Sequence, residues 1–190
     1  MTAAGPHGSG RERVLRGAIE YFAAHGIGDV SMRGLAAALG TSHRMLNHYF
    51  GSREGLLTAV VDAVEADQRE LLSTLLRDRE TDSRAALRHY WRQVSDAAVT
   101  YGPLFFELSG HAMQGRAHAV SLRESLIQPW LEPLELIFQR RGSDGAQAAV
   151  QARISLAVAR GLLLDLLLSG DRAGVDAAMG HLIDTELGAR

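Results

Sequence analysis

The stretch of sequence that decides the fold runs from residue 31 to residue 50 and reads SMRGLAAALGTSHRMLNHYF. Ser31 suits the N-cap of a short helix over residues 32–39, because a serine hydroxyl accepts a hydrogen bond from a backbone N–H of the first turn. Gly40 would end that helix in the left-handed conformation that glycine adopts freely. The Thr41-Ser42 pair then opens a second short helix through about residue 49. Two short helices joined by such a tight turn predict a helix-turn-helix.

Apolar residues in the same stretch fit the packing that this motif needs. Leu35 and Leu39 would pack on Leu46, and Ala36 is small enough to let the two helices approach closely. In a helix-turn-helix the second helix lies in the major groove of DNA, where its first residues reach the base edges. Arginine is the side chain that most often reads guanine there. The residues in that position are Ser42, His43 and Arg44.

The rest of the chain shows helical periodicity and no alternating strand pattern, so the predicted fold is all-α with about nine helices. Gly102-Pro103 would start a helix of its own, and Pro129 and Pro133 would kink another helix or delay its start. The expected helices cover residues 11–24, 32–39, 43–49, 53–76, 83–98, 103–112, 121–140, 144–168 and 172–187.

Residues 46–57 read LNHYFGSREGLL and define the type of helix-turn-helix. This run closely resembles the signature of the TetR family, in which a Tyr-Phe pair is followed by Ser-Lys-Glu and two apolar residues. The resemblance covers about residues 11–60, and beyond them only the helix layout and the segment 161–165 are similar. Matching residue types before the run are Phe22, Gly26, Ile27, Val30 and Ser31.

The resemblance implies an N-terminal helix-turn-helix DNA-binding domain and a C-terminal helical ligand-binding and dimerisation domain. The first would occupy residues 11–55 and the second residues 56–190, after a tail at residues 1–10 that we expect to be disordered. The last two helices, about residues 144–187, would form the interface of a homodimer, and the first of them is apolar on nearly all sides. Such a dimer would match a palindromic operator with half-sites about 34–36 Å apart.

Residue types in these last two helices fit that interface. Small side chains would let helices of the two subunits approach closely, and they stand at Ala148, Ala152, Ala159 and Gly161. The final helix would contribute a second apolar face, made of Val175, Met179, Leu182 and Ile183. Two such helices from each subunit would form a four-helix bundle about a twofold axis.

The resemblance also implies which side chains contact DNA. The phosphate contacts would come from Ser31, Arg33, Tyr49 and Arg53. Asn47 departs from the family, which usually has an aromatic residue at this place, and asparagine could instead read adenine. The whole set expected at double-stranded DNA is Ser31, Arg33, Thr41, Ser42, His43, Arg44, Asn47, His48, Tyr49 and Arg53.

Aromatic residues gather where the family has its effector pocket. An apolar wall with a few polar tips is typical of a small-molecule site, although aromatic residues at helical spacing also form ordinary cores, and both interpretations stay open. Arg160 and Asp165 interrupt an apolar helix; pairing across the dimer is favoured over a place in the pocket. The residues expected at the pocket are Tyr90, Trp91, Val94, Tyr101, Phe105, Phe106, Met113 and Trp130.

Composition argues against several other classes of protein. The 190 residues include no cysteine, which excludes disulfides and fits a cytoplasmic protein. The most apolar run, residues 154–168, is too short and too charged to span a membrane. No catalytic triad, metal-ligand spacing or phosphate-binding loop is recognisable, so we assign no catalytic residue, cofactor or metal. A helical enzyme or an interaction module without DNA binding is the alternative. Among regulators, family analogy favours a repressor over an activator, and the aromatic wall indicates that an apolar or aromatic effector releases it from DNA.

Overall fold

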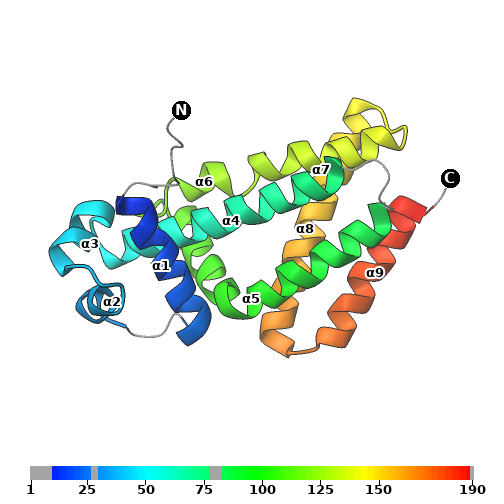
Figure 1. Ribbon diagram of the computed structural model, residues 1–190. Coiled ribbons are helices and arrows are strands. Elements are labelled where there is room, and N and C mark those ends of the chain that lie inside the picture. The colour runs from blue at the N-terminus through cyan, green and yellow to red at the C-terminus, as the bar shows by residue number, and fades with distance from the viewer. Residues whose placement is uncertain (1–9, 27–29, 78–82, 189–190) are drawn as a thin grey trace, which may run out of the picture.

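The computed structural model describes residues 10–26, 30–77 and 83–188, and every regular element within these ranges is a helix (Figure 1). The predicted all-α fold is confirmed. The expected tail at residues 1–9 lies outside the described residues, whereas Gly10 already belongs to the first helix. The helices are α1 (Gly10–His25), α2 (Met32–Ala38), α3 (His43–Phe50), α4 (Arg53–Arg77), α5 (Ser83–Met113), α6 (Leu122–Ser125), α7 (Gln128–Arg140), α8 (Gly145–Ser169) and α9 (Arg172–Gly188).

Short polar side chains fix the starts of the helices in the first quarter of the chain. Ser31, Ser42 and Ser52 each accept a hydrogen bond at 3.1 Å from the backbone N–H three residues further on. Such a bond satisfies one of the N–H groups that a helix start leaves without a partner. Gly40 follows α2 with a φ of 61°, which permits the tight turn into α3. The helix-turn-helix geometry that the sequence predicts is therefore present.

The prediction of a helix break at Gly102-Pro103 is wrong, because α5 runs unbroken from Ser83 to Met113 and only changes direction near this point (Figure 1). Proline removes the hydrogen bond to the carbonyl four residues earlier, which belongs to Val99. Val99 and Pro103 both lie on the exposed side of α5, so that carbonyl can bond to water instead. Gly102 marks a close helix crossing, since a Cβ there would lie 2.6 Å from Cδ1 of Leu167 on α8.

The expected helix over residues 121–140 is divided into the short α6 and the longer α7. Pro129 lies in the first turn of α7, where its missing N–H has no helical partner to lose. The predicted delay of this helix is thus confirmed. Pro133 lies inside α7 without ending it.

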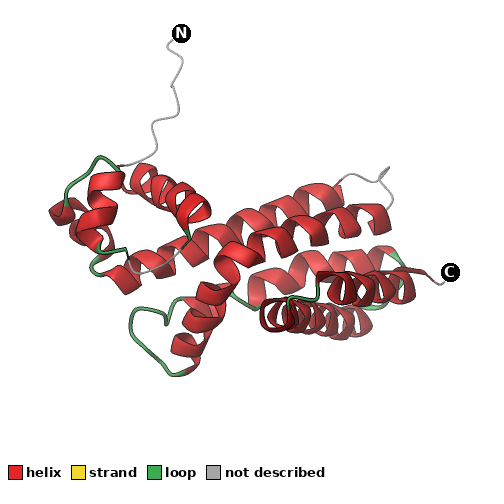
Figure 2. Ribbon diagram, turned by 90° about the horizontal axis from the view of Figure 1, so that it is seen from below, coloured by secondary structure: helices red, strands yellow, loops and turns green. Residues whose placement is uncertain are grey.

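Buried apolar side chains form two clusters, and α4 belongs to both. The first, the N-terminal core, packs α1 to α3 against the first half of α4, the second half of α5 and α6. The second, the C-terminal core, joins the second half of α4 and the first half of α5 to α7, α8 and α9. α4 therefore runs from the helix-turn-helix into the larger bundle (Figures 1 and 2). No helix in the described ranges is long and apolar enough to cross a membrane.

Candidate DNA-binding surface and ligand cavity

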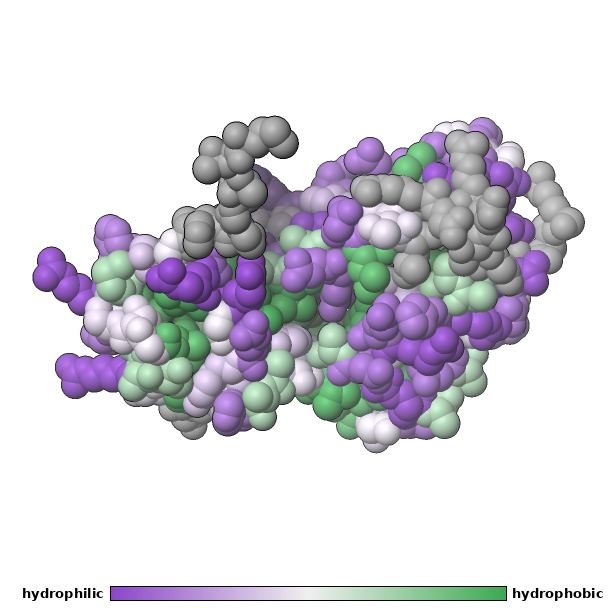
Figure 3. All heavy atoms as spheres, in the orientation of Figure 1, coloured by the Kyte–Doolittle hydropathy of each residue, from purple (hydrophilic) through white to green (hydrophobic). Residues whose placement is uncertain are grey.

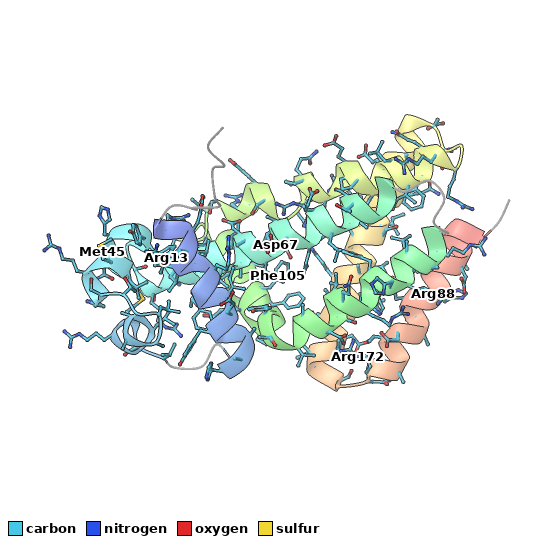
Figure 4. The ribbon with its side chains drawn as sticks, in the orientation of Figure 1. Arg13, Met45, Asp67, Arg88, Phe105 and Arg172 are labelled. Carbon is cyan, nitrogen blue, oxygen red and sulfur yellow. The ribbon has the colours of Figure 1, made fainter. Side chains whose placement is uncertain are left out.

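The recognition helix α3 is anchored by one side and exposed on the other. Leu46 is completely buried between α2 and the N-terminal core, where Leu35 and Ala36 are buried as well. Arg44, Asn47 and His48 are exposed, and their spacing of three and four residues puts them on one face of α3. Hydrophilic side chains project from this end of the molecule (Figure 3). Met45 lies on the outer side of α3 beside that face (Figure 4).

The other residues expected at DNA surround this face but differ in how free their side chains are. Arg33 is exposed on α2. The hydroxyls of Ser31 and Ser42 are held as helix caps, as described above. Arg53 is half-buried, and its Nε donates a hydrogen bond of 3.5 Å to the backbone carbonyl of Val30. Arg53 thus ties the start of α4 to the residue before the α2 cap. The side chains that are half-buried beside them are those of Thr41, His43 and Tyr49.

Asn47, the residue that departs from the family pattern, is in contact with a neighbour on α3. Its Nδ2 lies 3.4 Å from Nε2 of His43, one helical turn earlier. An amide held in this way loses less rotational freedom on binding than a free one. The contact therefore orients the group that we expect to meet a base edge.

The helix-turn-helix is also tied directly to the larger bundle. The phenol of Tyr101 on α5 donates a hydrogen bond of 2.8 Å to the backbone carbonyl of Ile19 on α1. Burial raises the pKa of Tyr101 above its ordinary value. The same side chain reaches the cavity described next, so one residue contacts both parts of the molecule.

A cavity of about 160 Å³ lies between α4, α5, α7, α8 and α9. An apolar cavity of about 150 Å³ is large enough to hold benzene. Phe105 points from α5 toward α4 into this region (Figure 4). Of the aromatic and apolar residues expected at the pocket, those that line the cavity are Tyr90, Trp91, Val94, Tyr101, Phe105, Phe106 and Trp130.

Met113 does not line the cavity, and its place in the expected pocket is wrong. Its side chain is 80% exposed at the last position of α5. The inner face of this half of α5 is made by Leu104, Leu108 and Ala112, which are all buried. Met113 follows that face by one residue and so turns outward.

The main polar feature of the cavity wall is an ion pair between Glu65 on α4 and Arg160 on α8, which the sequence did not predict. Their Oε2 and Nη2 atoms are 3.2 Å apart, and Nε1 of Trp130 donates to the same Oε2 at 2.9 Å. The guanidinium of Arg160 also lies 5.1 Å from the centre of the Phe105 ring. The favoured interpretation of Arg160 as a partner across the dimer is therefore wrong. Asp165 does not join it and is exposed.

Burial controls the electrostatics of this wall. Burial raises the pKa of the Glu65 carboxyl, and the attraction of Arg160 offsets the effect only in part. Burial likewise lowers the pKa of Arg160, against the opposing effect of Glu65. The phenol of Tyr90 is buried without a hydrogen-bond partner among the described residues, and burial raises its pKa strongly.

A histidine pair lies apart from the cavity. Nε2 of His118 and Nδ1 of His111 are 3.1 Å apart. Within the described residues, no group of three or more histidine, aspartate or glutamate side chains is arranged to hold a metal ion.

Comparisons with known proteins agree with this geometry. Residues 14–60, which span α1 to the start of α4, match the family described as bacterial regulatory proteins, tetR family. The chain belongs to the TetR family. It is thus a DNA-binding transcriptional regulator and not an enzyme.

Relatives of this TetR-family chain match at low identity. The HTH-type transcriptional regulatory protein RaaS of Mycobacterium tuberculosis is 30% identical over 115 residues, which are 60% of this chain and only 50% of RaaS. The HTH-type transcriptional regulator BetI of Pseudomonas aeruginosa is 29% identical over 188 residues, covering 92% of this chain and 89% of BetI. A solved TetR-family regulator from Mesorhizobium loti superposes with a TM-score of 0.70 at 14% identity, covering 93% and 94% of the two chains.

One helix of this TetR-family chain exposes an apolar stripe. Steps of four and three residues alternate along it, the spacing of a helix seam that packs against another helix. The stripe on α8 consists of Val150, Ile154, Ala157, Gly161, Leu164 and Leu168. The small residues expected at an interface are divided: Ala148 and Ala152 are completely buried in the C-terminal core, whereas Gly161 is exposed.

The exposed face of α9 also differs from the expected one. Val175, Met179 and Ile183 are buried in the C-terminal core. The side of α9 that faces outward instead carries small and polar residues, namely Gly174, Ala177, Ala178 and His181.

Proposed function

We propose that this regulator represses transcription as a homodimer on a palindromic operator, and that a small apolar or aromatic effector in the cavity releases it from DNA. The observation that carries the proposal is the course of α4. Its first turn packs beside the recognition helix, and its middle lines the cavity through Val61, Val64, Glu65, Gln68 and Leu72. A molecule in the cavity therefore contacts the helix that supports the DNA-binding surface.

The exposed stripe on α8 supports the homodimer. Apolar side chains arranged in one continuous stripe are costly in water, and a second copy of the same stripe would cover them. Gly161 and Ala157 at its centre leave room for two helix backbones to approach closely. The outward face of α9, with its small residues, would pack beside the stripe and complete a four-helix bundle.

Release of DNA requires that the effector distinguish two states of the dimer. A ligand with equal affinity for the DNA-bound and released states shifts nothing. A coupling of about 1–3 kcal/mol between the sites would lower operator affinity by about 5- to 150-fold. Movement of α4 would alter the spacing between the two recognition helices and so supply that coupling.

Filling the cavity tests the effector site. Ala159 on α8 lines the cavity, and Ala159→Leu should abolish the release of a labelled operator by biphenyl, because the added side chain takes the space of the ligand. The operator would be selected from random DNA, and its release measured by fluorescence anisotropy. The matched control is Ala146→Leu in the exposed first turn of α8. If biphenyl and similar apolar compounds bind the unmodified protein without weakening operator binding, the cavity is not the switch.

Two exposed arginines should affect DNA binding in different ways. Arg44→Ala should erode preference at one operator position by about 1–3 kcal/mol, as expected when a bidentate base contact is lost. Arg33→Ala should weaken binding to all sequences alike and reduce its dependence on salt, as loss of a phosphate contact does. Competition binding with single-base operator variants would distinguish the two effects. The control Arg92→Ala removes an exposed arginine from α5, and equal effects of all three changes would refute the assigned surface.

A further inference from the structure

The cavity is apolar except where charged and polar groups meet on its wall. Glu65 and Arg160 form the ion pair there, and Tyr90 lies close enough that both charges influence its pKa. All three side chains line the cavity. A ligand that fills the cavity therefore meets these groups within a wall that is otherwise mostly apolar, where Gln68 and Ser155 are the other polar aliphatic residues.

These groups retain hydrogen-bonding capacity that the described residues do not use. Both hydrogen bonds to Glu65, from Arg160 and Trp130, reach Oε2, and none from the described residues reaches Oε1. The Tyr90 hydroxyl has no partner among those residues either, although it can both donate and accept. A buried polar group without a partner costs about 1–3 kcal/mol, so a ligand that supplies the partner gains affinity.

The charges on this wall are already balanced. The carboxylate of Glu65 faces the guanidinium of Arg160 at 3.2 Å, and Arg69 and Asp62 influence Glu65 with opposite signs. An anionic ligand would gain from Arg160 but be repelled by Glu65, and a cationic ligand would meet the reverse. Either ion would also lose its hydration, which costs several kcal/mol when no net opposite charge receives it. A neutral hydrogen-bonding group avoids that cost.

We propose that the effector is a neutral, mostly apolar molecule with a hydroxyl group that donates a hydrogen bond to Oε1 of Glu65 and accepts one from the hydroxyl of Tyr90. The inference rests on the proposed function, because it assigns the chemistry of the ligand in the same cavity. Phenols and alcohols on an aromatic or fused-ring skeleton belong to this class. Arg160 then stays paired with Glu65 when the ligand is bound.

The two tryptophans of the chain, Trp91 and Trp130, both line the cavity, so intrinsic fluorescence reports directly on its occupation. Four probes that share one biphenyl skeleton separate the alternatives at pH 7: biphenyl, 4-hydroxybiphenyl, biphenyl-4-carboxylate and 4-biphenyl-trimethylammonium. The hydroxyl compound should bind roughly 5- to 150-fold more tightly than biphenyl, the gain from two net hydrogen bonds. The two ions should bind about tenfold or more weakly than biphenyl, because of their lost hydration.

Tyr90→Phe isolates the hydroxyl contact. The ratio of the affinities for 4-hydroxybiphenyl and biphenyl should fall roughly 2- to 12-fold in this variant, and taking the ratio cancels any change in cavity packing. Tightest binding of the carboxylate would overturn the inference in favour of an anion site at Arg160. Tightest binding of the ammonium compound would overturn it in favour of a cation site at Glu65. If no probe alters the fluorescence, the cavity does not take such ligands, and the effector site of the proposed function fails with it.

Discussion

An Ile154→Glu variant is expected to sediment as a monomer at micromolar concentration, where the unmodified chain is expected to sediment as a dimer. Ile154 is 49% exposed in the α8 stripe, so the proposed twofold interface would bury the new carboxylate near its counterpart in the second copy. A buried charge without an opposite partner costs about 3–5 kcal/mol, which is the loss found when one member of a buried ion pair is removed. Every 1.4 kcal/mol is about a tenfold change in affinity. The dimer should therefore weaken by about 100-fold or more.

Val120→Glu is the matched control for this variant. Val120 is also 49% exposed, but it lies in the connection between α5 and α6 and not on α8. This variant should remain dimeric and keep its affinity for the full operator. Ile154→Glu should lose that affinity together with the dimer, because one recognition helix contacts only one half-site. A dimer that survives in Ile154→Glu would show that the subunits meet elsewhere.

The helix-turn-helix was predictable because its signals are local. Capping serines, a turn glycine and apolar residues at helical spacing lie within a few residues of the groups they contact. Ser31 and Ser42 cap their helices as predicted, and Leu46 is buried as predicted. Local signals fail at Gly102-Pro103, where long-range packing keeps α5 continuous. Gly102 lets α5 pass close to Leu167 on α8, which is 65 residues away in the chain.

The aromatic part of the cavity was also predictable, because residues spaced by three and four on α5 share one side of the helix. The ion pair was not, since Glu65 and Arg160 are separated by 95 residues. Two signals could have pointed to it. Arg160 is a charge within an apolar helix, and Glu65 follows Val61 by four residues on the buried face of α4. Neither signal identifies the partner.

The two sides of α8 could not be separated from sequence either. A helix that is apolar all round has no periodicity to show which residues face its own core. In the structure α8 packs against α5, α7 and α9, so that Ala148 and Ala152 are buried in the C-terminal core whereas Ile154 and Leu168 are exposed. Leu168 is 79% exposed, more than any other large hydrophobic residue of α8, and this exposure supports the proposal that a second copy packs on this side.

Removing one member of the buried ion pair should destabilise the fold strongly. The side chains of Arg160 and Glu65 are only 18% and 11% exposed. Arg160→Met would leave the carboxylate of Glu65 buried without its cation, which should lower the free energy of unfolding by about 3–5 kcal/mol. Urea-induced unfolding at one fixed protein concentration would measure the loss, since the stability of a dimer depends on concentration.

The double variant Glu65→Gln with Arg160→Met should regain most of that stability. The glutamine is neutral, and its amide oxygen still accepts the hydrogen bond from Nε1 of Trp130, so no charge and no indole N–H is left without a partner. Replacing a buried ion pair by neutral groups of similar volume is often neutral or stabilising. The control Arg92→Met at an exposed position should change stability by about 0.5 kcal/mol at most. If the double variant is as unstable as Arg160→Met alone, the loss comes instead from the packing of Arg160 on the Phe105 ring, because that contact is absent from both variants whereas the unpaired carboxylate is present only in the first.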